Sequence, residues 1–333
     1  EGNRWSKAVP KGLGITLQQA YDQSKSLQTL VQTNERYQKM FQVAKVLEGL
    51  PRHISTHAAG VVIADQNLID LVPLQAGQSE SWLTQFTMID VEKLGLLKMD
   101  FLGLRNLSII DDALKGIRTL QREELIIKKV PLDDCKTLEL FKKGDTSGVF
   151  QFESAGIRKV LQKVEPDNIE EIAAVNALYR PGPMENIDTY VRRKKGIEKT
   201  EYIDESFRPI LEVTNGVIIY EEQIMQVAQK MAGYTLGQAD ILRRGISKKK
   251  AEILEAQRQS FIEGSQAKGH TLAKANEVYN YIEKFANYGF NRSHAFAYSF
   301  VAYQMAYLKA HYPGPFYKAL LKSVQSQPTK IRE

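Results

Sequence analysis

The sequence is poor in the residues that form disulfides and soft-metal clusters. Cys135 is the only cysteine among 333 residues, which excludes an internal disulfide and a metal cluster made of thiolates. His53 and His57 lie close together, but no third histidine or cysteine joins them to complete a zinc site. We therefore interpret this pair either as polar contacts beside an active site or as ordinary loop or core histidines.

Long apolar runs are also absent. No stretch of about 18 consecutive apolar residues occurs, so the sequence predicts no membrane-spanning helix and no membrane partner. The first residues, from Glu1 to Trp5, have neither the layout of a signal peptide nor an initiator methionine. We expect a fragment of a longer, cytoplasmic protein, which the low cysteine content also favours.

The overall composition is that of a globular protein. Apolar residues make up 43% of the chain and charged residues 25%. A length of 333 residues exceeds what one small core supports, so we expect two or three subdomains. The net charge of +6 permits a nucleic-acid partner without requiring one.

Basic residues gather in three segments. Residues 192–199 hold five cations around Glu198, residues 243–250 hold five cations and no acid, and residues 284–332 hold seven cations and no acid. Such clusters are typical of proteins that bind polyanions. Each of them is also compatible with a solvated helix face.

Hydrophobic periodicity predicts an α+β fold that is predominantly helical. Apolar spacing indicates a helical hairpin over residues 16–48, capped at Thr16 and Asn34, and a small β-rich unit over residues 51–104. The rest of the chain is mostly helical. The strands we expect are Gly60–Ala64, buried on both faces, and Leu71–Leu74, Trp82–Phe86, Leu96–Phe101, Gly148–Phe152 and Val217–Tyr220. The later helices we expect are 107–120, 134–143, 154–164, 168–179, 221–231, 236–244, 248–267, 271–286, 293–311 and 314–325.

The strand at Leu96–Phe101 carries the most informative pair of residues. Lys98 and Asp100 are two positions apart in an apolar run, so their side chains project from the same face. A carboxylate in apolar company is paired, hydrogen-bonded or bound to a metal. Our hypothesis is that Asp100 binds a metal and Lys98 meets a phosphate; the alternative is a solvent-facing pair on a half-buried strand. Asp90 and Glu92 precede a turn, and we interpret them as surface acids.

Three later segments combine cations or aromatic rings with glycine or proline. Pro181-Gly182-Pro183 forms a rigid turn that either positions Arg180 or simply ends a helix. In Leu242–Lys250, Gly245 and Ser247 predict that one helix ends and another begins. Three lysines at the start of the new helix would oppose its dipole, and a bound phosphate would relieve this conflict. In Asn287–Tyr298, Ser293 is the expected helix cap, and the interleaved aromatic and polar side chains suit base stacking or a packed loop.

Taken together and in this order, these motifs resemble one family. They are Thr56–Val62, Leu97–Leu104, Gly148–Ser154, Tyr179–Pro183, Tyr220–Met225, Leu242–Lys250 and Tyr288–His294. The chain, to about residue 325, resembles the C family of DNA polymerases, the bacterial DNA polymerase III α subunits, of the type without an exonuclease insertion. The resemblance implies the end of the thumb at 1–50, the last part of a polymerase β-like nucleotidyltransferase palm at 51–104, and the fingers at 105–333.

The same resemblance implies a site for two-metal phosphoryl transfer from dNTP to a primer 3′ end. Asp100 matches the third of three catalytic aspartates that hold two Mg²⁺ ions, and Lys98 matches the palm lysine that faces the triphosphate. The residues that we assign to nucleotide binding are Arg180, Arg243, Arg244, Lys248, Asn291, Arg292 and His294. Those that we assign to DNA binding are Arg192, Arg193, Lys194, Lys249 and Lys250.

The chain also departs from the family pattern. No Asp-x-Asp pair precedes residue 60, and the PHP, clamp-binding and oligonucleotide-binding parts are missing. We therefore expect the chain alone to be inactive and to reach the sliding clamp and other replisome subunits only through absent regions. Primer-template DNA and dNTP are the expected ligands. Two alternatives are a DNA-binding module without chemistry of its own and a helical interaction domain that does not bind DNA.

Overall fold

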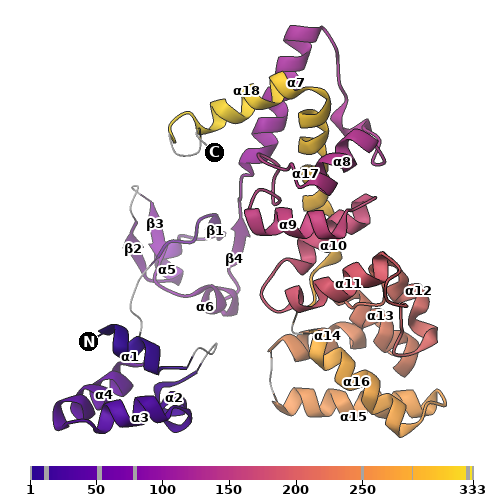
Figure 1. Ribbon diagram of the computed structural model, residues 1–333. Coiled ribbons are helices and arrows are strands. Elements are labelled where there is room, and N and C mark those ends of the chain that lie inside the picture. The colour runs from indigo at the N-terminus through magenta and orange to yellow at the C-terminus, as the bar shows by residue number, and fades with distance from the viewer. Residues whose placement is uncertain are drawn as a thin grey trace. The chain divides into compact units, whose positions relative to one another are not determined.

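The computed structural model describes residues 2–10, 15–50, 55–77, 81–248, 251–286, 288–327 and 331, without the side chains of 246–248, 251–254 and 286 (Figure 1). The chain divides into two compact units, Glu1–Gly103 and Leu104–Glu333. Helices dominate, and strands occur only in the first unit, within the described ranges. Of the helices described, none has the length and apolarity that crossing a lipid bilayer requires.

The first unit begins with short helices. They are α1 (Gly2–Ala8), α2 (Leu17–Gln23), α3 (Lys25–Gln32) and α4 (Glu35–Leu47). The predicted caps are confirmed, because the Thr16 hydroxyl accepts from the Gln19 N–H and the Asn34 side chain accepts from the Tyr37 N–H. The predicted first helix is interrupted at Ser24, whose hydroxyl caps α3 and donates to the Ala8 carbonyl.

The rest of this unit contains two small antiparallel sheets. Strand β1 (Gly60–Ile63) pairs with β4 (Leu97–Asp100), and β2 (Leu74–Ala76) pairs with β3 (Trp82–Thr84). Short helices α5 (Leu68–Leu71) and α6 (Met88–Lys93) lie between the strands in sequence. The predicted strand at Leu71–Leu74 is therefore wrong except for Leu74, because Leu71 ends a helix and β2 begins only at Leu74.

Strand β1 is also less buried than its sequence predicts. Val61 is 47% exposed and Ile63 41% exposed. They lie opposite Met99 and Leu97 of β4, which are 43% and 57% exposed. A sheet of two strands leaves this apolar face uncovered within the unit, whereas an unbroken apolar run is typical of strands covered on both sides.

The second unit is helical. Its α-helices are α7 (Arg105–Gln121), α8 (Cys135–Lys143), α9 (Ala155–Val164), α10 (Ile169–Leu178), α11 (Ile187–Lys194), α12 (Arg208–Leu211), α13 (Glu221–Ala232), α14 (Leu236–Lys248), α15 (Ala251–Ala267), α16 (Leu272–Ala286), α17 (Arg292–His311) and α18 (Pro313–Val324). Single 3₁₀ turns occur at Ile127–Lys129, Pro183–Asn186, Glu205–Phe207 and Glu212–Thr214.

Two hydrophobic cores hold these helices together. The first gathers residues of α7 to α11, α17 and α18, and the second gathers residues of α12 to α16 (Figure 1). Helix α17 crosses the first core, where Ala302, Tyr303 and Ala306 are fully buried. The Tyr303 hydroxyl donates to the Pro131 carbonyl and accepts from the Asp134 N–H, and these bonds connect α17 to the start of α8.

Four predictions for this unit are corrected. Residues 148–152 form turns and not a strand, because Gly148 and Gln151 have φ of +74° and +67°. Val217–Tyr220 makes only an isolated bridge, in which Tyr220 pairs with Phe290. Helix α14 continues through Gly245 to Lys248, so Lys248 ends a helix and does not begin one. The cap of α17 is Asn291, not Ser293.

Candidate functional site

Lys98 and Asp100 of β4 form an ion pair at one end of a cavity. The Lys98 ammonium lies 2.5 Å from Asp100 Oδ1, and the Lys98 side chain is 13% exposed while that of Asp100 is 53% exposed. This bond lowers the pKa of the Asp100 carboxyl, so the group is a carboxylate at neutral pH. The prediction that the two side chains share a face is confirmed.

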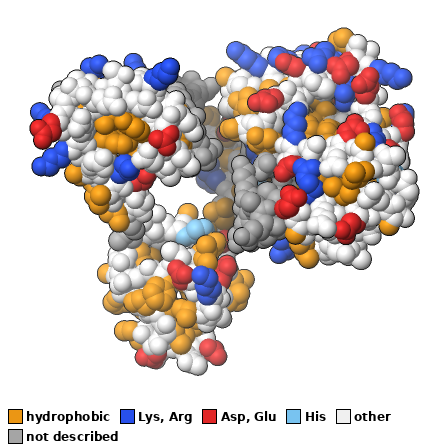
Figure 2. All heavy atoms as spheres, turned by 90° about the horizontal axis from the view of Figure 1, so that it is seen from below, with side chains coloured by type: hydrophobic (Ala, Val, Ile, Leu, Met, Phe, Trp, Pro, Cys, Tyr) orange, Lys and Arg blue, Asp and Glu red, His pale blue; other side chains and the backbone are white. Residues whose placement is uncertain are grey.

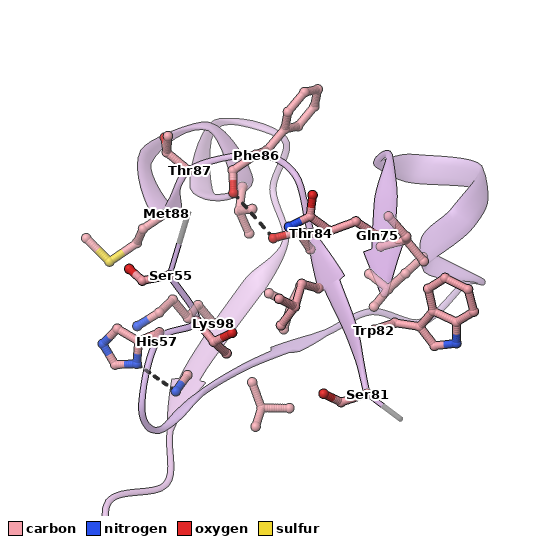
Figure 3. A pocket seen from close by; sticks show the side chains of 18 residues that line it. Ser55, His57, Gln75, Ser81, Trp82, Thr84, Phe86, Thr87, Met88 and Lys98 are labelled. Carbon is pink, nitrogen blue, oxygen red and sulfur yellow. Dashed lines mark hydrogen bonds between the residues drawn. The ribbon is translucent and has the colours of Figure 1, made fainter. Parts of the chain in front are cut away.

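His57 joins this pair from the loop before β1. Its Nδ1 lies 3.9 Å from Asp100 Oδ1 and accepts hydrogen bonds from the N–H groups of Gly60, at 2.8 Å, and Ala59, at 3.2 Å. Figure 3 shows the amino end of Lys98 beside the His57 ring, in a cavity of about 590 Å³ lined mainly by apolar residues. His53, the other histidine of the predicted pair, lies outside the described residues.

Gly60 provides the space in which these side chains converge. It lies opposite Asp100 in the pairing of β1 with β4. A Cβ atom at Gly60 would come within 2.8 Å of Lys98 Cε, 3.0 Å of His57 Nδ1 and 3.3 Å of Asp100 Oδ1. The motif Thr56–Val62 thus belongs to the site through a backbone position that our residue assignment missed, although its glycine was visible in the sequence.

The residues present fit one ligand of a magnesium site but not a whole site. An exposed, ionised carboxylate suits a hard cation. Among the described residues, however, no group of three or more His, Cys, Asp and Glu side chains could hold a metal ion. Asp90 and Glu92 lie on α6, where Asp90 accepts a hydrogen bond from the Thr87 hydroxyl.

In the second unit, Arg180 lies in an aromatic setting. Its guanidinium stacks on Phe290 at 4.3 Å and donates to the Tyr288 carbonyl at 2.9 Å. Burial lowers the pKa of Arg180, and no described acid pairs with it. His294 and Tyr298 of α17, with ring centres 3.9 Å apart, line the same cavity of about 270 Å³. A desolvated cation beside stacked rings suits an anion that carries an aromatic group.

Two glutamates organise the start of α17. The Asn291 side chain accepts from the His294 N–H and donates to Glu221 and Glu222. Glu222 also accepts from the Arg292 N–H at 3.0 Å, which places a carboxylate at the positive end of the helix. The Arg292 guanidinium is bonded to Glu170 at 2.6 Å. The motif Tyr220–Met225 therefore supports the predicted nucleotide-binding segment, a role that we did not assign from the sequence.

The two arginines of α14 are paired as well. Arg243 contacts Glu221 at 2.8 Å and Asp240 at 2.7 Å, and Arg244 contacts Asp240 at 2.8 Å. Arg243 is thereby joined to the same glutamate as Asn291. Lys248 is the last described residue of α14, and its side chain lies outside the described residues. Lys249 and Lys250 lie outside the described residues.

The basic segment at the end of α11 is engaged in internal ion pairs. Arg192 and Arg193 both bond to Glu198, at 2.9 and 3.0 Å. Lys194 is 12% exposed and contacts Asp167 at 2.8 Å and Glu171 at 3.1 Å. Figure 2 likewise shows acidic and basic side chains interspersed on the face in view. These pairs reduce the charge available to DNA, and DNA binding by the three cations stays a prediction.

Comparison with known proteins assigns both units. The model of the bacterial DNA polymerase III alpha NTPase domain matches residues 1–103, and that of the alpha subunit finger domain matches residues 106–269. Proteins named DNA polymerase III subunit alpha are similar to this chain over nearly its whole length. The protein from Halalkalibacterium halodurans is 51% identical to the chain over 98% of its residues, that from Bacillus subtilis is 50% identical over all of them, and that from Staphylococcus aureus is 48% identical over 99%.

The two family models meet at the boundary between the two structural units. Together with the relatives, they identify the two units as the NTPase and finger regions that these models describe. The chain belongs to the bacterial DNA polymerase III α family. It spans 29% to 31% of the length of these relatives, so it corresponds to a part of such a subunit.

Proposed function

We propose that this chain supplies one edge of a template-directed DNA polymerase active site. In the intact subunit, the primer 3′-hydroxyl attacks the α-phosphate of a dNTP, a new O3′–P bond forms, and the bond to pyrophosphate breaks. Asp100 acts as one metal ligand, and Lys98 binds a phosphate of the nucleotide. When bound, Mg²⁺ lowers the pKa of the attacking hydroxyl and neutralises charge on the leaving group.

The convergence of Lys98, Asp100 and His57 over Gly60 carries this proposal. The arrangement brings a carboxylate, an ammonium and an imidazole together over a backbone position that has no side chain of its own. Lys98 neutralises Asp100 in the free site, and a phosphate group can replace the carboxylate as the partner of its ammonium. The pKa of Asp100 is lowered, so the group is already ionised when a metal arrives.

We propose that the second unit binds the incoming nucleotide. The stacked, half-buried Arg180 and the rings of His294 and Tyr298 offer a cation and π surfaces in one cavity. Arg243, Arg244, Asn291 and Arg292 are joined by Glu221, Glu222 and Asp240, so phosphate binding there would exchange partners within a network. Base pairing, checked by the shape of the pocket, selects the nucleotide.

The remaining partners lie outside the described site. We propose that other carboxylates complete the two-ion site, that primer-template DNA is gripped partly by Arg192, Arg193 and the neighbouring lysines, and that the sliding clamp binds through other regions of the subunit. The chain alone is then inactive. An alternative is that the chain only binds DNA, which its basic segments favour.

The substitution Asp100→Asn in the intact subunit tests the catalytic assignment. It removes the negative charge and keeps the shape, so primer extension should fall to background while the Kd for primer-template changes little. The matched control is Asp90→Asn, because Asp90 is also an exposed acid of the first unit, with its side chain 49% exposed. Near-normal extension by Asp100→Asn would refute the assignment.

A further inference from the structure

His57 is fixed by its own loop. Its Nδ1 accepts the Gly60 N–H at 2.8 Å and the Ala59 N–H at 3.2 Å. A nitrogen that accepts two N–H groups carries no proton, so the geometry assigns the proton of the neutral ring to Nε2. This nitrogen has no hydrogen-bond partner among the residues that the structure describes. The loop therefore presents one oriented N–H donor.

The residue that carries this donor borders a site suited to a polyanion. The His57 side chain is 55% exposed and lines the same cavity as Lys98, Ser55 and Thr56 (Figure 3). The charged groups beside it are the Lys98 ammonium and the Asp100 carboxylate, which are already bonded to each other. An additional acceptor for the Nε2–H must come from outside, and a ligand next to Lys98 carries negative charge. Phosphate oxygens meet both demands.

We propose that His57 is a second phosphate-binding donor of this site, whose neutral Nε2–H bonds to a non-bridging oxygen of the β- or γ-phosphate while Lys98 neutralises the charge. This inference rests on the proposed function and adds a residue to it. The two nitrogens have separate tasks, because Nδ1 orients the ring and Nε2 makes the contact. His57 thus contributes as a hydrogen-bond donor and transfers no proton.

Two substitutions separate these nitrogens. His57→Asn keeps an acceptor near the position of Nδ1, since an Asn side chain bonds readily to backbone N–H groups two residues on, but it lacks the outer donor. His57→Gln reaches the position of Nε2 with an amide N–H but lacks the inner acceptor. The measurements are the KM for dNTP and inhibition by pyrophosphate, which carries the two phosphates in question, in the intact subunit.

His57→Asn should raise the KM for dNTP and the inhibition constant for pyrophosphate by about tenfold, the value of one hydrogen bond to a charged group. His57→Gln should change the inhibition constant for pyrophosphate by no more than about threefold, because the amide N–H of the glutamine still donates to the phosphate. Normal constants for His57→Asn would overturn the inference, and so would equal losses in both variants, because the ring would then matter for packing alone. If His57→Asn fails to fold, the inhibition constant of His57→Gln for pyrophosphate tests the inference. A rise of about tenfold in that constant would overturn it, because this variant keeps the outer donor.

Asp100→Asn, measured in parallel, distinguishes this inference from the proposed function. If Asp100→Asn is inactive and His57→Asn is normal, only the role of His57 fails. If Asp100→Asn still extends primers, the catalytic assignment fails first. Primer-template affinity should be unchanged in both His57 variants, because the contact is made to the nucleotide.

Discussion

Gly60 lies opposite Asp100 in the antiparallel pairing of β1 with β4, and its lack of a side chain leaves room for the groups of the site. The backbone of Gly60 also donates to His57 Nδ1. One residue therefore creates the space and orients a side chain that borders it. Its φ lies outside the left-handed region, so alanine can adopt this backbone conformation and the effect of a substitution will be local.

Gly60→Ala should lower primer extension with little loss of stability. The new methyl would lie 2.8 Å from Lys98 Cε, and that flexible side chain can move away at the expense of its ammonium position. Misplacement of a reacting group by about 1 Å costs up to about a hundredfold in rate. Single-turnover extension by the intact subunit measures this. Gly103→Ala is the control, since nothing lies within 4 Å of a Cβ there; equal activity of the two variants would contradict the crowding argument.

Arg180→Lys should raise the KM for dNTP by about tenfold, although the charge is kept, because an ammonium loses the planar stack and the forked donors of a guanidinium. The relevant contacts are the Phe290 ring and the Tyr288 carbonyl. Arg208→Lys is a matched control: Arg208 also stacks on a ring, that of Tyr202, but it is paired with Glu205. An unchanged KM in Arg180→Lys would remove this residue from the nucleotide site.

Lys194→Met should lower the free energy of unfolding by about 1–3 kcal/mol, the usual effect of leaving bonded partners unsatisfied. The Lys194 ammonium donates to the carbonyls of Val164 and Glu165 at the end of α9 and to Asp167. Urea denaturation of the chain measures the change. The control is Lys199→Met, because exposed Lys199 makes no such bonds.

The same two variants test the predicted DNA contact of α11. Loss of one phosphate contact lowers the slope of log Kd against log salt by about 1. Filter binding at several salt concentrations therefore shows whether Lys194 also reaches DNA. An unchanged slope in Lys194→Met would assign this lysine to structure alone.

Asp167→Asn should destabilise the protein at neutral pH and lose its effect in acid. Hydrogen bonds from Lys142 and then from Lys194 lower the pKa of Asp167 in the folded state. A lowered pKa means that the stabilisation is present above the unfolded value of about 3.9 and disappears as the pH falls through the folded value. Melting temperatures of both proteins between about pH 7 and pH 2 check this. A difference that does not shrink in acid would contradict it.

Local features were predictable from the sequence. Thr16 and Asn34 could be identified as caps because the side chain of each accepts from an N–H only three residues ahead. Lys98 and Asp100 were expected on one face because side chains in a strand alternate. Both inferences depend on the geometry of a single element, which short-range sequence determines.

Features that depend on distant segments were not predictable. Gly148 was assigned to a strand, yet a Cβ there would meet Leu320 of α18, so the packing of a distant helix sets this turn. The cations of the basic segments were interpreted as DNA or nucleotide contacts, but the acid that pairs with Lys194 lies 27 residues away and the one that pairs with Arg292 lies 122 residues away. Charge clusters along the chain do not show which cations folding will pair.

Helix α17 connects the proposed nucleotide cavity to the centre of the second unit. His294 and Tyr298 lie near its first turns, whereas Tyr303 and Lys309, further along, are buried and bonded to the segments that flank α8. A helix of 20 residues is about 30 Å long. Ala295, near the start of the helix, is fully buried as well. The core therefore holds α17 along its length, and the helix keeps its two aromatic rings at a set distance from α8.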